Sequence, residues 1–216
     1  GNILTELQKS SIIPQLLVND QKIIKALISK DFSLLSDKFS SFITDISIAS
    51  ITLFNENGSI VAFDAKKNFQ KNRSYKILAT YTKHTPETVM SVLKKNNNEF
   101  GFFYSRGIEE ENRSLGTIFI EVDLSKFEKA WTENGEAVFI TDSAGLIILS
   151  SEPSWKGLNE KQAFNIKTPE NAIKRVYNLT AGWSSLKGNE TYEIAHKTTR
   201  FTENIPLLNW NISSFI

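Results

Sequence analysis

Apolar residues in the first 46 positions recur every three or four residues, the spacing of one face of an amphipathic helix. This spacing predicts a long N-terminal helical segment over residues 1–46. Pro14 is expected to kink the segment, and Asn19-Asp20 and Asp31 are placed as N-caps that would restart it. The apolar face must be covered, either by a following sheet or by the same helix of a second copy.

After this segment the period of the pattern changes to two, which is typical of strands. Residues 51–63 are a strand, an Asn-x-x-Gly turn and a second strand, ITLFNENGSIVAF. Residues 137–149 repeat this order with an Asp-x-x-Gly turn, AVFITDSAGLIIL. Two copies of one hairpin, about ninety residues apart, predict two related domains in tandem.

The first sheet is predicted to run from residue 51 to residue 123. A polar stretch at 66–76 and a helix at 86–95, which starts with a proline, interrupt it. Strands at 100–105 and 117–122, joined through an acidic turn, complete it.

Apolar residues at i, i+3 and i+7 over 124–131 predict a short linking helix. The second sheet is expected to begin near residue 136, to contain a helix near 170–177, and to end with strands near 191–197 and 209–215. The four tryptophans are interpreted as core anchors.

The predicted fold class is α+β. It divides into the helical segment 1–46, a larger sheet domain over 47–128 and a smaller one over 129–216. Hydrophobic residues make up 40% of the 216 positions, which is enough for two packed cores.

Charge and composition exclude several classes of function. The chain has 25 basic and 24 acidic residues spread along its length, so no nucleic-acid partner is expected. It has no cysteine, which excludes disulfides and thiolate chemistry. No stretch approaches the ~20 apolar residues that span a bilayer. Because both ends lie within regular elements, the chain is interpreted as a piece of a longer protein.

The sequence offers little for catalysis. His84 and His196 lie in different predicted domains and have no metal-ligand spacing, so no metal and no cofactor is expected. No phosphate-binding loop, dinucleotide fingerprint or nucleophile elbow occurs. The chain is therefore predicted to bind a ligand and not to be an enzyme, with a hydrolase as the outside possibility.

Six segments, taken in order, carry a family resemblance. They are residues 12–28, 49–62, 101–105, 116–131, 138–155 and 207–212. Together they resemble the extracytoplasmic sensor regions of bacterial four-carbon dicarboxylate sensor histidine kinases, which have a double Cache (tandem PAS-like) fold.

The resemblance implies a periplasmic ligand-sensing region of an inner-membrane histidine kinase whose catalytic part lies outside this chain. The domain farther from the membrane, 47–128, would hold a small-molecule ligand, and the nearer domain, 129–216, would pass the change on. The polar loop 66–76 would become ordered when the ligand binds. A homodimer through the N-terminal helix is the expected assembly.

The resemblance also implies site residues. Arg73 and Tyr75 match an Arg-x-Tyr segment beside the family's pocket, and Ser105 matches the serine that ends its aromatic strand. Phe103 stands where the family usually has a tyrosine. Glu121 stands where the family has a lysine that faces the carboxylate ligand.

Strand alternation places Phe119, Glu121 and Asp123 on one acidic face. A glutamate there would repel a dicarboxylate by about 4 kcal/mol, for unit charges at about 4 Å and an effective dielectric near 20. We therefore expect a small organic acid or an amino-acid-like ligand, and the acidic face favours an amino acid or related zwitterion. Arg73 would hold its carboxylate, Glu121 or Asp123 would receive its ammonium group, and aromatic residues 102–104, including Tyr104, would form a wall.

Three alternatives remain open at the level of sequence. Arg73 could pair internally with Glu121 and leave no site for a charged ligand. The parent protein could be a chemotaxis receptor with the same tandem domains. The sensor could also be driven by a partner protein without a small molecule.

Overall fold

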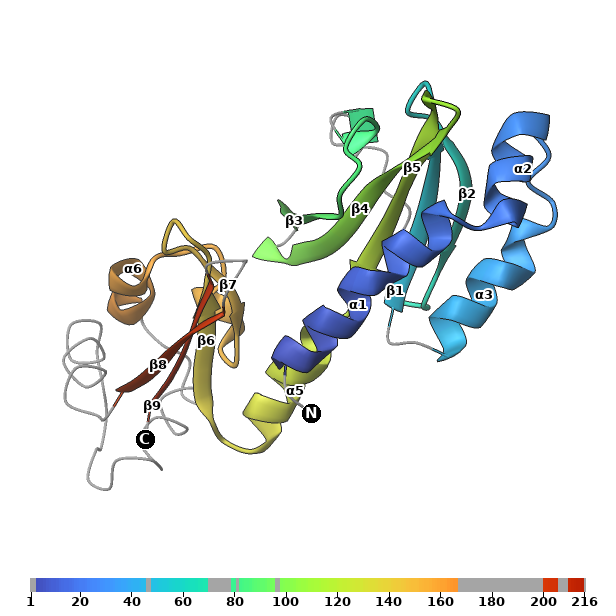
Figure 1. The fold of residues 1–216 in the computed structure, drawn as a ribbon. Helices are drawn as coiled ribbons and strands as arrows, with labels where there is room; N and C mark the ends of the chain where they lie inside the picture. The colour runs from blue at the N-terminus through green and yellow to red at the C-terminus, as the bar shows by residue number, and fades with distance from the viewer. Residues whose placement is uncertain are drawn as a thin grey trace. The chain divides into compact units, whose positions relative to one another are not determined.

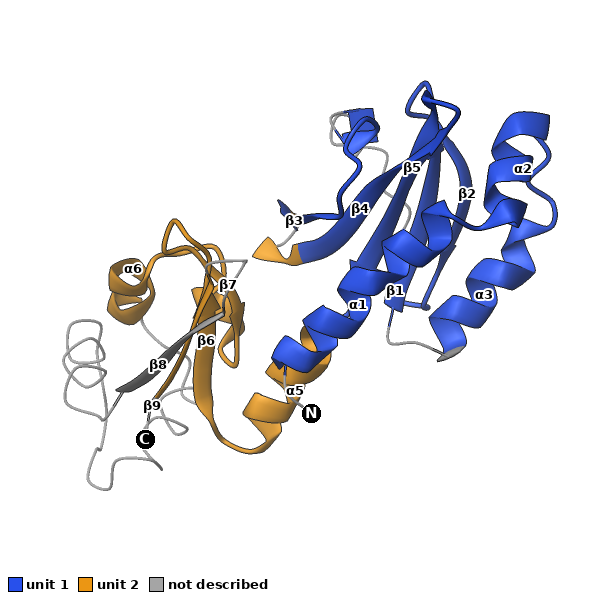
Figure 2. Cartoon of the chain, in the orientation of Figure 1, with its two compact units in different colours: residues 1–93, 101–123 blue, residues 94–100, 124–216 orange. Residues whose placement is uncertain are grey.

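The computed structural model describes residues 3–45, 48–69, 79–80, 82–95, 98–166, 200–205 and 210–215. The chain forms two compact α+β units (Figures 1 and 2). The first unit comprises residues 1–93 and 101–123, and the second comprises 94–100 and 124–216. The second unit thus includes a short segment, 94–100, that lies inside the predicted first domain.

The predicted N-terminal helical segment consists of three helices: α1 (Ile3–Val18), α2 (Gln21–Ser29) and α3 (Leu35–Asp45). Asp20 is the N-cap of α2, as predicted, and its Oδ1 accepts the Lys22 and Ile23 N–H groups at 2.9 and 3.3 Å. Pro14 is buried inside α1, which continues through it to Val18.

The N-cap predicted at Asp31 is wrong. Its Oδ1 accepts the N–H and the hydroxyl of Ser33 at 3.1 and 2.7 Å, in a turn that precedes the first residue of α3. A short polar side chain can close a local turn as readily as it caps a helix, and here the turn is the outcome.

A five-stranded sheet forms the body of the first unit, with strand order β2-β1-β5-β4-β3. β1 is antiparallel to both β2 and β5, and β5 is antiparallel to β4. The strand bounds are β1 (Ile48–Asn55), β2 (Ile60–Ala65), β3 (Val89–Lys94), β4 (Phe100–Glu110) and β5 (Arg113–Val122).

The helix predicted at 86–95 is wrong, because β3 occupies most of this stretch as the edge strand beside β4. The stretch is too short for its apolar spacing to distinguish a helix from a strand. Its β-branched residues Val89 and Val92 favour the strand, and pairing with β4 decides the outcome.

The two faces of this sheet have different surroundings. On one face, β5 is packed by α1, and β1 and β2 by α3. Ile51, Ile118 and Ile120 are fully buried there. The hydroxyl of Tyr104 donates to the Leu7 carbonyl of α1 at 3.1 Å, so Tyr104 belongs to this helix-covered face.

The second unit begins with α5 (Ser125–Glu133), the predicted linking helix. Its sheet has the order β7-β6-β9-β8. The strands are β6 (Ala137–Thr141), β7 (Ile147–Ser150), β8 (Arg200–Ile205) and β9 (Trp210–Phe215). The predicted hairpin and the predicted last strand are confirmed, whereas the helix near 170–177 and the strand near 191–197 lie outside the described residues.

Two short helices follow β7. They are the 3-10 helix η3 (Pro153–Trp155) and α6 (Glu160–Asn165), which the sequence reading missed. α6 has a capping box between Asn159 and Gln162, a signal that the sequence does carry. Trp155 and Trp210 are buried core anchors, as predicted.

The predicted hairpin repeat is confirmed in detail. The turn after β1 starts at Asn55 and the turn after β6 at Asp142. In each, the side-chain Oδ1 accepts the N–H groups two and four residues further on, at 2.9–3.0 Å. Gly58 and Gly145 each supply the positive φ, 73° and 80°, that the turn needs. The two units therefore share their entry hairpin.

Candidate functional site

The sheet face of the first unit that lies opposite the helices carries buried polar side chains. Opposed residues on antiparallel strands point to the same side of the sheet, so the register defines rows across β1, β5 and β4. The three rows are Ser50–Glu121–Phe103, Thr52–Phe119–Ser105 and Phe54–Thr117–Gly107.

The third row is closed by a turn to which residues 79–80 and 82–85 belong. A Cβ on Gly107 would lie 2.3 Å from the Lys83 carbonyl oxygen, so only glycine permits this approach. The Thr117 hydroxyl donates to the Ala79 carbonyl at 3.2 Å. The turn thus covers the third row, and the first two rows carry the polar side chains that remain.

Aromatic rings form the floor beside these polar groups. Phe119 lies 5.1 Å from Phe54 and 6.1 Å from Phe103, measured between ring centroids. All three rings are at most 1% exposed and form one cluster with Ala79. This arrangement provides the apolar wall that small-ligand sites commonly have.

Glu121 places a carboxylate in this buried face. Its side chain is 2% exposed, and its Oε2 accepts a hydrogen bond from the Ser50 hydroxyl at 3.1 Å. The predicted sharing of one face by Phe119 and Glu121 is confirmed, and Asp123 lies half-buried just after β5 ends at Val122. Burying a carboxylate is costly unless it is paired and hydrogen-bonded, so such a group commonly marks a site with a specific use.

Ser105 is the second unusual group of this face. It is fully buried, and among the residues that the structure describes its hydroxyl has no hydrogen-bond partner. An unsatisfied buried hydroxyl costs about 1–3 kcal/mol, which a ligand could recover by hydrogen bonding to it.

The predicted aromatic wall over residues 102–104 requires a correction. Strand alternation puts Phe103 beside Glu121 but points Phe102 and Tyr104 to the opposite face. Burial against α1 raises the pKa of Tyr104 to about 12. The structure thus brings together Phe103, Ser105 and Glu121 but not Tyr104.

Arg73 and Tyr75, which the family resemblance implied, lie outside the described residues. The sequence reading missed Ser50 and Thr52, which are buried in the same face at 2% and 6% exposure. Their signal is visible in the sequence, because they alternate with Ile51 and Leu53 in an otherwise apolar strand.

A separate pocket of about 200 Å³ lies elsewhere in the first unit, lined in part by Leu27, Phe32, Glu56 and Arg113. Glu56 and Arg113 are 3.7 Å apart and well exposed, as expected for a weak surface ion pair. None of the predicted site residues lines this pocket.

Within residues 3–45, 48–69, 79–80, 82–95, 98–166, 200–205 and 210–215, no three His, Cys, Asp or Glu residues gather as metal ligands. Within those same ranges, no helix has the length and apolar character needed to cross a membrane.

The chain is similar in sequence to known sensor proteins. No family model matches the chain. It is 25% identical over 164 residues to the C4-dicarboxylate transport sensor protein DctB of Rhizobium meliloti, a match that covers 71% of this chain and 26% of that protein. The chain thus spans about a quarter of the length of this curated relative.

Solved structures share the fold. The sensor domain of the Vibrio cholerae histidine kinase DctB matches with a TM-score of 0.65 and 16% identity, over 99% of this chain and 90% of that one. The ligand-binding domain of the Pseudomonas fluorescens chemoreceptor CtaA, in complex with L-serine, matches with a TM-score of 0.61 and 12% identity, over 100% and 90%. The chain is homologous to the DctB sensor proteins and has the α+β Cache sensor fold.

Proposed function

We propose that this chain is the extracytoplasmic ligand-sensing region of a membrane-anchored bacterial sensor histidine kinase. Its similarity to the DctB sensor proteins supports this proposal. The first unit, with its buried polar face, holds a small organic ligand, and the second unit passes the change toward the membrane. The chain itself is not an enzyme, and the kinase part belongs to the rest of the protein.

The ligand class follows from Glu121. A buried carboxylate attracts an ammonium group by about 4 kcal/mol at about 4 Å and an effective dielectric near 20, and it repels a carboxylate by the same amount. We infer that the ligand carries a positively charged amino group, as an amino acid does. Ser105 receives a second polar group of the ligand, Phe103 and Phe119 contact its apolar part, and Arg73 binds its carboxylate.

The neighbouring structure supports an amino acid, because the CtaA domain of similar fold is in complex with L-serine. The relative in sequence is a sensor of C4-dicarboxylates by name. A dicarboxylate would require Glu121 to be neutralised, for example by Arg73. The proposal of an amino acid thus depends on an ionised Glu121 that contacts the ligand.

A thermal-shift screen against amino acids, simple amines and C4-dicarboxylates tests the ligand class. A ligand at 100 times its Kd should add about 2.7 kcal/mol of stability. Stabilisation by an amino acid that is lost in Glu121→Gln supports the proposal. Stabilisation by succinate or malate alone would contradict it, and no shift with any compound would favour a partner-driven sensor.

We also propose that the protein is a homodimer through α1. Ile12 and Leu16 are 55% and 59% exposed although they are large and apolar. They stand four residues apart, so they lie on one exposed face of α1 that the same helix of a second copy would cover. Light scattering should detect a dimer that the double variant Ile12→Lys, Leu16→Lys abolishes; a monomeric wild type would contradict this.

A chemotaxis receptor is the second candidate for the parent protein. The fold similarity to the CtaA chemoreceptor domain favours it, and the sequence similarity to DctB favours the kinase. Identifying the cytoplasmic domain of the full-length protein decides between them. Both place this chain in the periplasm.

A further inference from the structure

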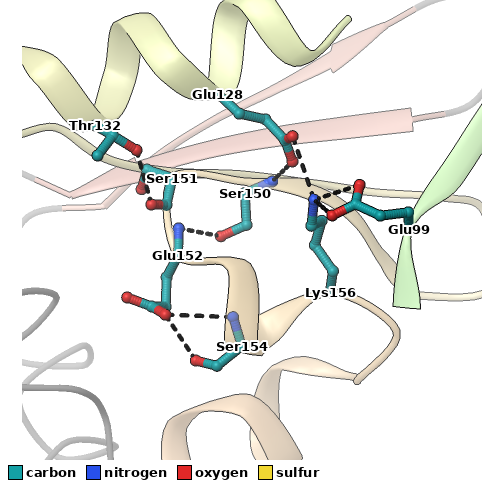
Figure 3. A network of polar contacts seen from close by, with 8 residues as sticks. All are labelled: Glu99, Glu128, Thr132, Ser150, Ser151, Glu152, Ser154 and Lys156. Carbon is teal, nitrogen blue, oxygen red and sulfur yellow. Dashed lines mark hydrogen bonds and ion pairs between the residues drawn. The ribbon is translucent and has the colours of Figure 1, made fainter. Parts of the chain in front are cut away.

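An ion cluster around the buried Lys156 joins three segments of the second unit (Figure 3). The side chain of Lys156 is 5% exposed, and its Nζ lies 2.8 Å from both carboxylate oxygens of Glu99 and 3.3 Å from Oε2 of Glu128. A lysine that is removed from water needs such partners, because an unpaired buried ammonium is strongly destabilising. Lys156 therefore holds Glu99 and Glu128 together.

The backbone of Lys156 is fixed to the second sheet. Its neighbour Trp155 is buried and contacts the ring of Phe164 edge-on at 5.1 Å. On the other side, the N–H of Gly157 donates to the carbonyl of Ile147 in β7 at 2.8 Å. The ammonium group thus projects from a rigid base.

Glu128, in the first turn of α5, is held to the end of β7 by more than Lys156. Its Oε1 accepts the N–H of Ser150 at 2.9 Å. One turn further along α5, the hydroxyl of Thr132 donates to the Ser151 carbonyl at 3.0 Å (Figure 3). α5 should therefore stay attached to β7 when Lys156 is removed.

Glu99 depends more on Lys156. Its side chain is 54% exposed, and both of its carboxylate oxygens bind the buried ammonium. It directly precedes Phe100, the first residue of β4. Within the second unit, the ion pair thus ties the residue that precedes β4 to the turn that carries Lys156.

The chain connections give this cluster a role. Glu99 leads into β4, which carries Phe103 and Ser105, and Glu128 lies in the helix that follows β5, which carries Glu121. We propose that Lys156 is the joint through which a change at the ligand-binding face of the first unit reaches the second unit. This inference rests on the proposed function, because it assigns a route to the signal from that site.

A shift of β4 or β5 along its length moves Glu99 or Glu128 relative to a fixed ammonium. The ion pairs must then stretch, or the turn that carries Lys156 must follow. α5 has additional contacts with β7 and does not depend on Lys156 alone. The position of Glu99, in contrast, depends on its ion pair with Lys156.

Hydrogen exchange of the whole chain, measured by mass spectrometry, tests the joint without any ligand. Lys156→Met keeps most of the side-chain stem and removes the charge. It should raise exchange over residues 98–105 by about tenfold, equivalent to roughly 1.4 kcal/mol, and change α5 by less than about threefold. Lys129→Met is the matched control. Lys129 pairs with Glu133 on the exposed face of α5, so its replacement should change exchange in neither segment.

Transmission is tested by combining this variant with a change at the site. Glu121→Gln should alter exchange over residues 147–158 when Lys156 is present and should not alter it in the Lys156→Met background. An equal effect in both backgrounds would overturn the proposal. If Lys156→Met does not fold, Glu99→Gln removes the same pair and gives the same readout. No ligand is used, so a failure of this experiment is distinguishable from a failure to find one.

Discussion

Replacing Ser105 with alanine should stabilise the ligand-free protein. The Ser105 hydroxyl is fully buried and, in the described part of the chain, makes no hydrogen bond. Removing it relieves a desolvation cost of about 1–3 kcal/mol and sacrifices only the packing of one oxygen atom. We expect a net gain of about 1 kcal/mol, which corresponds to a rise in Tm of roughly 2–4 °C for a chain of this size.

Ser150→Ala is the matched control, with the opposite sign expected. Ser150 is equally buried, but its Oγ accepts the N–H of Glu152 at 2.9 Å. Alanine leaves that N–H unsatisfied in a buried position, which should cost about 1–3 kcal/mol. Thermal unfolding followed by near-UV circular dichroism, without ligand, measures both variants.

The two variants thus distinguish a hydroxyl that is available to a ligand, that of Ser105, from one that stabilises the fold, that of Ser150. Ser105→Ala should also reduce the stabilisation given by the best compound of the thermal-shift screen. A loss of Tm in Ser105→Ala as large as that in Ser150→Ala would refute the reasoning, because it would mean that the Ser105 hydroxyl already has a partner in the protein.

Three further predictions follow from single contacts. Tyr104→Phe should cost about 1 kcal/mol in chemical denaturation, through the lost bond to Leu7, and leave the ligand-induced shift unchanged; a lost shift would contradict the assigned face. Burial raises the pKa of Glu128 above its usual 4.5, so the folded state binds the proton more tightly and stability should fall as pH rises above 4.5. The free energy of unfolding, measured by denaturation at several pH values, should depend less on pH in Glu128→Gln than in the wild type. An unchanged pH dependence would contradict this burial. Burial raises the pKa of Asp20, but hydrogen bonds from Lys38 and from the first turn of α2 lower it by more, so the net shift is downward. The contribution of Asp20 to the stability of the fold is therefore lost as pH falls below 3.8. Asp20→Ala should cost about 1 kcal/mol at pH 7 and less at pH 3, and an equal cost at both would argue against the cap.

Local rules account for what the sequence predicted well. The turns at Asn55 and Asp142 were visible because a side-chain acceptor and a glycine stand three residues apart. The N-cap at Asp20 and the shared face of Phe119 and Glu121 follow from equally short-range geometry.

Long-range contacts account for what the sequence could not give. Residues 89–94 form a strand because β4 offers them an edge, which no local pattern records. Tyr104 was assigned to the wrong face because a run of aromatic residues conceals the alternation of the strand. The partners of Lys156 lie 57 and 28 residues away along the chain, so the sequence around Lys156 does not predict the ion cluster.

The charge of the ligand group that meets Glu121 is the central claim, and calorimetric titration with matched pairs tests it most directly. Each pair is an L-amino acid and its 2-hydroxy acid analogue, which differ in an ammonium group against a hydroxyl, with succinate as a third compound. We predict that the wild type binds one amino acid at least about tenfold more tightly than its analogue and than succinate, and that Glu121→Gln removes this preference. Binding of succinate or of the hydroxy acid as tight as that of the amino acid would contradict the account.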